Sequence, residues 1–350
     1  MRASVLTDVG SVEVEERELP EPGPNEVLVL VGACGVCMTD FHMYHGSFDV
    51  ETPLVLGHES AGEVVATGDD VKTADVGDRV AMNPVVPCHA CKYCKRGETH
   101  LCEHNTSIGG AGETIIDGAF AEYVRVPETN VEDVGDMPYE RAALAEPLAC
   151  CIHGVDRVDI GHGDSVAIIG AGPIGLLLLQ TFRDRGAAPV IVSELDAERR
   201  QLAEELGADV TIDPAEEDPV EVVDSIVGKV DVAVEAVGMV PTIEQANEMV
   251  AKGGDTLVFG VPSQDATLEI DPFDVYFREA DYRGTYALDT DDFQRAVRLL
   301  EYGRIETEPL VTETLGLSEL PTAFERMENT EGLKKLVRPG RETAEDGGGR

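Results

Sequence analysis

Basic residues are scarce in this 350-residue chain, which holds 27 Lys plus Arg against 68 Asp plus Glu and has a formal net charge of −41. The resulting field repels the phosphates of nucleic acids and anionic membrane surfaces, so we expect neither as a partner. The acidic residues are spread along the sequence, and we interpret them as a solvated surface. Acidity of this strength predicts a host with a salty cytoplasm, where ions screen the self-repulsion.

Long apolar runs are also lacking. No segment reaches the roughly 18 apolar residues that a membrane-spanning helix needs. The N-terminal MRASVLTDVG contains no apolar signal segment, so the expected location is the cytoplasm. Hydrophobic residues still make up 43% of the chain, which is enough for folded cores, and the length favours two domains.

Four of the eight cysteines are clustered, at spacings of two, two and seven intervening residues. In a chain without a secretion signal, metal ligation is favoured over disulfide formation. Four thiolates from one loop can fill the coordination of a tetrahedral ion, so we predict a structural zinc lobe at about residues 86–104. A nucleic-acid zinc module is excluded because few basic residues lie nearby. The predicted ligands are Cys88, Cys91, Cys94 and Cys102.

A second set of ligand types is dispersed along the sequence. Cys37 lies in the stretch GVCMTDFH, His58 and Glu59 follow Gly57, and Glu146 precedes a proline. If the fold brings these side chains together, protein ligands with one coordination position left open would form a catalytic zinc site. The sequence therefore predicts one structural and one catalytic metal site.

A glycine-rich turn follows the short apolar strand predicted at residues 165–169. It is the hexapeptide Gly170-Ala171-Gly172-Pro173-Ile174-Gly175, and it opens an apolar helix over 176–182. The first glycine permits a tight turn, the second lets backbone amides approach a pyrophosphate, and the third packs helix against strand. The N-terminus of the helix favours the phosphate charge. Gly170, Gly172, Pro173, Ile174 and Gly175 are thus candidate cofactor-binding residues.

The next predicted strand, over 190–194, ends in the acid Glu194. A carboxylate at this point accepts hydrogen bonds from the adenosine ribose and repels a 2′-phosphate, which favours NAD over NADP. Asp196 is the alternative acid. Arg199 could lie over the adenine or admit a 2′-phosphate in part, so NADP stays open as the second cofactor.

Strands and helices then alternate up to residue 259, which is typical of a parallel sheet with helices on both faces. We expect helices over 197–206, 219–227 and 242–250, and strands over 209–212, 230–235 and 256–259. Ligands of such sheets bind at the carboxyl ends of the strands. We therefore expect Val237, Gly238, Gly260 and Val261 near the cofactor. Before this region, residues 1 to about 65, 77–81 and 117–127 favour short β segments, and residues 139–155 a helix.

In this order of features the chain resembles the zinc-dependent medium-chain dehydrogenases, over about residues 2–338, and most of all their sorbitol (polyol) and L-threonine dehydrogenase branch. The resemblance implies an α/β protein with a β-rich GroES-like catalytic domain (1–155 and 290–350) and a doubly wound, parallel-sheet Rossmann domain (156–289). The segments that carry it are Cys34–Cys37, Asp40–His42, Gly57–Glu59, Asp117–Tyr123 and Ala145–Leu148.

The resemblance also implies the metal ligands. Cys37 and His58 would bind the catalytic zinc, and Glu59 would bind it or stand directly behind it. Glu146 occupies the position where other branches place a cysteine or aspartate ligand. Cys150–Cys151 compete for this role, but an acid before proline fits the branch better.

Further roles follow from the same resemblance. Thr39 matches the hydroxyl that takes the proton from a zinc-bound alcohol, and His42 the relay to solvent. Asp40 would orient a zinc ligand, and Lys334 matches a basic residue near the cofactor. Met38 departs from the small glycine usual after the catalytic cysteine, which would narrow the pocket.

The expected function is hydride transfer from a polyol or secondary alcohol to NAD, with two zinc ions per chain and small-molecule substrates. L-threonine 3-dehydrogenase is the alternative within the family. A non-catalytic nucleotide-sensing zinc protein is the alternative from another class. A homodimer or homotetramer is implied by the resemblance alone.

Overall fold

The computed structural model describes residues 1–341, so the end of the predicted segment 290–350 lies outside the described residues. The chain divides into two compact units. The first comprises Met1–Ala149, Leu288–Gly303 and the segment from Thr307 onward. The second comprises Cys150–Ala287 and Arg304–Glu306. Among the described residues, no helix has the length and apolar character needed to cross a membrane.

The first unit is built on a seven-stranded sheet whose main order is β11-β6-β5-β3-β19-β18, with β10 also paired to β3. Apolar side chains of β3 and β5 fill a core that includes Phe120 and Phe324. The strands of this sheet are β3 (Glu26–Gly35), β5 (Glu59–Thr67), β6 (Arg79–Met82), β10 (Tyr123–Pro127), β11 (Val131–Asp133), β18 (Val311–Leu315) and β19 (Lys334–Val337).

Two small sheets complete the β structure of this unit. They are β1 (Arg2–Asp8), β2 (Ser11–Glu16) and β4 (Leu54–Val55), and β7 (Val85–Val86), β8 (Thr106–Ile108) and β9 (Thr114–Ile116). The helices are α1 (Met38–Tyr44), α2 (Tyr139–Ala142), α9 (Thr290–Glu301) and α10 (Leu320–Glu328), with α3 (Ala145–Asp156) crossing the boundary between the units.

The helix expected over 139–155 is two helices, α2 and α3, and Glu146 lies in the first turn of α3 rather than near the middle of one helix. Pro147 explains the position of the second start, because proline lacks an N–H and is tolerated in the first helical turn. Helix α1 also interrupts the stretch in which only strands were expected.

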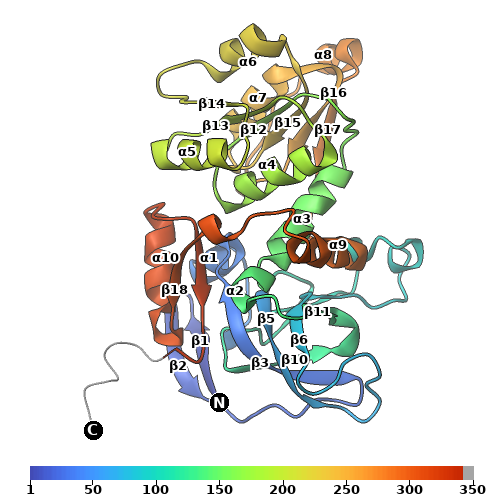
Figure 1. Ribbon diagram of the computed structural model, residues 1–350, viewed down its shortest axis with the longest axis vertical. Helices are drawn as coiled ribbons and strands as arrows, with labels where there is room; N and C mark the ends of the chain where they lie inside the picture. The colour runs from blue at the N-terminus through green and yellow to red at the C-terminus, as the bar shows by residue number, and fades with distance from the viewer. Residues whose placement is uncertain (342–350) are drawn as a thin grey trace. The chain divides into compact units, whose positions relative to one another are not determined.

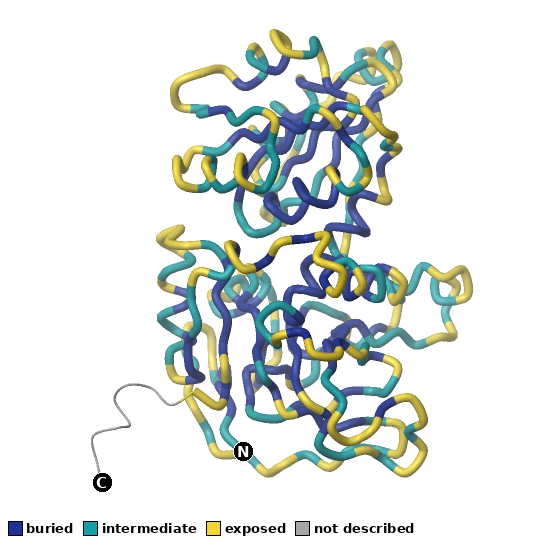
Figure 2. The backbone as a smooth tube through the Cα atoms, viewed as in Figure 1, coloured by how far each residue is buried: buried dark blue, intermediate teal, exposed yellow. Residues whose placement is uncertain are grey.

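The second unit contains a six-stranded parallel sheet of order β14-β13-β12-β15-β16-β17. Figure 1 shows α4 and α5 on one face of this sheet and α6 and α7 on the other. Its inner strands β12 and β13 are buried at every residue (Figure 2), as expected of a sheet covered on both faces. The strands are β12 (Val166–Ile169), β13 (Val190–Ser193), β14 (Val210–Ile212), β15 (Val230–Glu235), β16 (Val250–Val258) and β17 (Asp281–Gly284).

The helices of this unit are α4 (Pro173–Arg185), α5 (Ala197–Glu205), α6 (Pro219–Val227), α7 (Val240–Met249) and α8 (Pro272–Arg278). The strand order changes side at β12: β13 and β14 follow on one side of it, and β15, β16 and β17 on the other. β12 and β15 are therefore neighbours in the sheet although they are not consecutive in the sequence. This switch point is where open α/β sheets bind ligands, at the carboxyl ends of the strands.

Candidate metal centre and cofactor site

Cys37 is held at the N-terminus of α1 by a reciprocal cap. The Cys37 backbone N–H donates to Asp40 Oδ2 at 2.9 Å, and the Thr39 N–H donates to Cys37 Sγ at 3.5 Å. Both contacts belong to the cap at the start of α1. The cap therefore fixes the position of the Cys37 side chain.

Strand pairing brings Glu59 to the same place. Gly35, two residues before Cys37, pairs with Glu59 across β3 and β5, and His58 precedes β5. A Cβ on Gly35 would lie 2.0 Å from Glu59 Oε2, so only glycine leaves room for this carboxylate. The ligand atoms of Cys37, His58 and Glu59 all lie within 4.8 Å of one another. Residues distant in sequence thus form one potential metal-binding group.

A carboxylate stands behind His58. Asp40 is fully buried, accepts a hydrogen bond from the Gly57 N–H at 3.3 Å, and lies 3.4 Å from His58 Nδ1. Burial opposes a charge on His58, but Asp40 and Cys37 outweigh it and raise the pKa of the imidazole well above its usual value. Because Nδ1 of His58 faces Asp40, the Nε2 nitrogen of His58 is left to bind a metal.

Lys334 pairs with Glu59 inside the protein. Its amine donates to Glu59 Oε1 at 2.6 Å and to the Val36 carbonyl at 3.1 Å. Burial alone would lower the pKa of Lys334, but the charges of Glu59 and Cys37 raise it. This buried pair joins β5 to β19 and was not predicted. The expected contact of Lys334 with the cofactor stays a prediction.

The remaining predicted catalytic residues are Thr39, His42 and Glu146. Thr39 and His42 are both on α1 and are partly buried. Burial, together with the charge of His45, lowers the pKa of His42 below 6.5. Glu146 is buried and its charge acts on Lys334, but it does not belong to the three-residue ligand group.

The four-cysteine loop forms a second ligand group. Sulfur–sulfur distances are 3.5 Å for Cys91–Cys94, 3.9 Å for Cys91–Cys102 and 4.0 Å for Cys88–Cys94. Zn–S bonds of about 2.3 Å in a tetrahedron place the sulfurs about 3.8 Å apart. Backbone N–H groups, first that of Cys94, lower the pKa of Cys91 to about 6. The cluster fits zinc closely and leaves no ligand position open.

The glycine turn of the second unit has the geometry of a phosphate cradle. Gly170 has φ +100°, and a Cβ on Gly175 would lie 2.0 Å from the Gly170 carbonyl oxygen, so helix and strand pack closely. A Cβ on Gly172 would meet no atom within 4 Å, so this side of the turn is open. Gly172 is also the N-cap residue of α4, and no side chain accepts a hydrogen bond from the first turn of this helix. The first-turn N–H groups of α4, including those of Ile174 and Gly175, therefore remain for an anionic ligand.

Glu194 lies at the end of β13 beside this turn. Its Oε2 accepts a hydrogen bond from the Ala171 N–H at 2.7 Å, and its Oε1 accepts one from the Asp196 N–H at 3.0 Å. Asp196 caps α5 by accepting from the Arg199 N–H at 3.0 Å. The alternative acid is thereby engaged in a helix cap, whereas Glu194 is fixed against the glycine turn.

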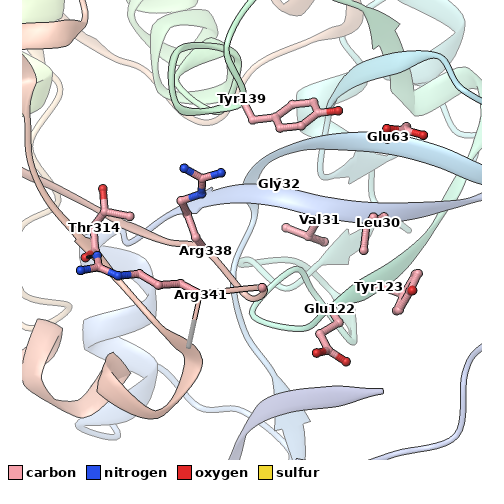
Figure 3. Close-up of a pocket in the computed structure, with 11 residues that line it drawn as sticks. Leu30, Val31, Gly32, Glu63, Glu122, Tyr123, Tyr139, Thr314, Arg338 and Arg341 are labelled. Carbon is pink, nitrogen blue, oxygen red and sulfur yellow. Dashed lines mark hydrogen bonds between the residues drawn. The ribbon is translucent and has the colours of Figure 1, made fainter. Parts of the chain in front are cut away.

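A cavity of about 720 Å³ in the first unit lies elsewhere (Figure 3). Its lining includes Gly32, Tyr139 and Arg338, and none of the ligand group Cys37, His58 and Glu59. Arg338 is already paired with Glu140 at 2.7 Å. This hollow is therefore not the metal centre.

Two family models match the chain. "Alcohol dehydrogenase GroES-like domain" matches residues 23–136, and "Zinc-binding dehydrogenase" matches residues 173–302. Sorbitol dehydrogenase of Bacillus subtilis (strain 168) is 34% identical over 350 residues, covering 97% of this chain and 98% of that protein. L-threonine 3-dehydrogenase of Pyrococcus horikoshii is 38% identical over 325 residues, covering 90% of this chain and 91% of that protein.

Among solved structures, a zinc-binding dehydrogenase from Sinorhizobium meliloti 1021 bound to NADP has a TM-score of 0.91 at 39% identity, with 97% of this chain and 99% of that chain covered. The fold and its two ligand groups define a zinc- and nicotinamide-dependent dehydrogenase. The chain belongs to the zinc-dependent medium-chain dehydrogenase/reductase family. The predictions of family, α/β fold class, enzymatic activity and cofactor classes are confirmed, and the alternative of a non-catalytic sensor has no support among these relatives.

Proposed function

We propose that this enzyme oxidises a polyol or another secondary alcohol with NAD, at a zinc ion held by Cys37, His58 and Glu59. The proximity of these three side chains is the observation that carries the proposal. Their donor set of one thiolate, one imidazole and one carboxylate suits zinc. Glu146 remains the predicted ligand for the third position if Glu59 stands directly behind the ion, which keeps one position open for the alcohol. Its burial beside the charge of Lys334 is compatible with that role.

When bound, zinc acts as a Lewis acid that favours the alkoxide of an alcohol. The protein's part is to hold the ligands and to accept the proton. Thr39, two residues after Cys37, is the proposed first acceptor, and His42, one helical turn further on α1, passes the proton to solvent. The lowered pKa of His42 keeps its imidazole neutral, and therefore able to accept a proton, down to lower pH than an ordinary histidine.

NAD is the proposed cofactor. Gly170, Gly172, Pro173, Ile174 and Gly175 would bind the pyrophosphate, and Glu194 the adenosine ribose, where its charge disfavours a 2′-phosphate. Arg199 is the residue that could offset this preference. The NADP in the Sinorhizobium meliloti structure makes NADP the cofactor to test beside NAD.

Of the two substrate classes, we favour an uncharged polyol over an amino acid. A threonine carboxylate calls for a cation near the metal, and the neighbouring cation Lys334 is already engaged by Glu59 and the Val36 carbonyl. Threonine nevertheless remains the second candidate, because L-threonine 3-dehydrogenases are among the most similar relatives.

The decisive assay measures kcat/KM for sorbitol, xylitol, 2,3-butanediol and L-threonine, each with NAD and NADP in molar KCl. A polyol or butanediol turned over at least about tenfold faster than threonine, with NAD preferred, is the expected result. A reversed substrate order would assign the threonine activity, and turnover of none of the four would contradict the proposed substrate class.

The wider organisation stays a proposal as well. We propose a catalytic domain of residues 1–155 and 290–350 with the zinc lobe at about 86–104, a dinucleotide-binding domain of residues 156–289, a cytoplasmic location in a salt-rich cell, and a homodimer or homotetramer. Size-exclusion chromatography with light scattering in molar KCl tests the oligomeric state.

A further inference from the structure

Glu235 is a buried carboxylate for which the proposed chemistry has no role. It ends β15, immediately across the switch point from β12, and pairs in register with Ile169, the residue before the glycine turn. Figure 1 shows β15 beside β12 in the centre of the sheet, with α7 following it. The exposed fraction of Glu235 is 0%. A buried charge is costly unless it is well hydrogen-bonded, so its contacts indicate its purpose.

The side chain and the backbone of Glu235 hold two different turns. Oε1 accepts hydrogen bonds from the backbone N–H groups of Val237 at 2.8 Å and Gly238 at 2.7 Å, and from the Thr242 hydroxyl at 2.7 Å. The backbone carbonyl oxygen of Glu235 accepts hydrogen bonds from the N–H groups of Phe259 and Gly260, each at 2.9 Å. One residue thus fixes the turn after β15 and the turn after β16.

The two turns also interlock through their backbones. Gly238 has φ +91°, and a Cβ there would lie 2.6 Å from the Val261 carbonyl oxygen. A Cβ on Gly260 would lie 2.2 Å from the Gly238 nitrogen. Because neither turn has room to shift alone, loss of the Glu235 side chain would displace both.

The surface that these turns present is apolar and lies at the glycine turn. Val237 is 47% exposed and Val261 is 60% exposed. A Cβ on Gly170 would lie 2.9 Å from Val237 Cγ2, so the Val237 side chain rests against the glycine turn. Since Glu194 lies on the β13 side of the switch point, the β15 side is left for the other nucleotide of the cofactor.

We propose that Glu235 is a positioning residue that holds residues 237–238 and 259–261 as a preformed apolar seat for the nicotinamide half of the cofactor. This inference rests on the proposed use of NAD. The second oxygen, Oε2, has no hydrogen-bond partner among the described residues. The acceptor at Oε1, rather than the full carboxylate, therefore does the positioning.

Three variants separate positioning from general stability. Glu235→Met keeps the side-chain volume and removes the acceptor, whereas Glu235→Gln keeps an acceptor and removes the charge. Asp231→Ala is the matched control at the amino end of the same strand, where Asp231 Oδ2 accepts from the Ser165 N–H and hydroxyl, both at 2.8 Å. The measurements are NADH dissociation constants by calorimetry on the zinc-loaded enzymes in molar KCl, and melting temperatures.

Glu235→Met is expected to weaken NADH binding by about tenfold or more, which corresponds to about 1.4 kcal/mol. Glu235→Gln and Asp231→Ala are expected to stay within about twofold of the parent, even where Asp231→Ala melts earlier. Unchanged NADH affinity in Glu235→Met, or an equal loss in Asp231→Ala, would overturn the inference. A loss in Glu235→Gln as large as in Glu235→Met would also overturn it, because charge and not the acceptor would then matter.

Hydrogen exchange on the parent enzyme gives a test that needs no variant to fold. The N–H groups of Val237 and Gly238 are expected to be protected before NADH is added. Rapid exchange that NADH then slows would show that the cofactor, not Glu235, orders the turn. Failure of the parent to bind NADH would instead refute the proposed cofactor, so the two failures are distinguishable.

Discussion

The buried pair of Lys334 and Glu59 allows a quantitative test. Lys334→Met removes the cation at similar side-chain volume and leaves a carboxylate that is 1% exposed. Loss of one partner of a buried ion pair costs about 3–5 kcal/mol, because the other charge stays buried and uncompensated. At roughly 2–4 °C per kcal/mol for domains of 150–250 residues, the melting temperature of the zinc-free protein should fall by roughly 6–20 °C.

Zinc should reduce this loss. If Glu59 binds or closely faces the ion, the metal supplies the positive charge that Lys334→Met removes, so the zinc-loaded variant should lose less stability than the zinc-free one. Glu59→Gln combined with Lys334→Met should recover much of the loss, since the Glu59 charge that Lys334 compensated is then removed as well.

Calorimetric melts of the parent, both single variants and the double variant, with and without zinc, measure these effects as a double-mutant cycle. Equal destabilisation by Lys334→Met in the two metal states would refute the placement of Glu59 at the ion. A double variant less stable than Lys334→Met alone would refute the account of the pair itself.

Three further predictions concern the second metal site, a histidine and the surface. Cys94→Ser should remove the structural zinc and lower the melting temperature while part of the activity remains; a stable but wholly inactive variant would mean that the two sites are exchanged. Because the pKa of His42 is lowered from 6.5, the step that depends on His42 should persist at pH 6.5 and fail only at lower pH. His42→Ala should remove this acidic limb from the pH profile of kcat. An unchanged profile would exclude the relay. Exposed acids such as Asp69 and Glu216 should make the melting temperature rise between low and molar KCl, as the Debye length falls from about 10 Å at 0.1 M to about 3 Å at 1 M; no rise would contradict a salt-adapted surface.

The sequence was most informative where local signals agree. Helix α6 was expected over 219–227 and lies at Pro219–Val227, because Asp218 caps it, Pro219 begins it and Gly228 ends it. Strand β15 likewise has its expected bounds. Strand β16 instead begins at Val250, six residues before the expected start. Its pairing with β15 is irregular there, and two glycines, Gly253 and Gly254, lie within the strand.

Features that depend on tertiary packing were not predictable. Helix α8 carries the exposed aromatic residues Phe273, Tyr276 and Phe277, so it lacks the buried stripe by which an amphipathic helix is found. The pairing of Lys334 with Glu59 was not predictable either, because nothing local indicates that a lysine 275 positions away from Glu59 becomes its buried partner. The ligand types at the metal centre could be inferred from motifs, but their convergence required the fold.

The most direct test of a catalytic ion at Cys37 is the zinc content of purified Cys37→Ser, measured beside its turnover and its affinity for NADH. The parent should hold about two zinc ions per chain, one structural and one catalytic. The variant should hold about one, bind NADH as the parent does, and show no alcohol oxidation. A variant that keeps both ions and its turnover would contradict the account.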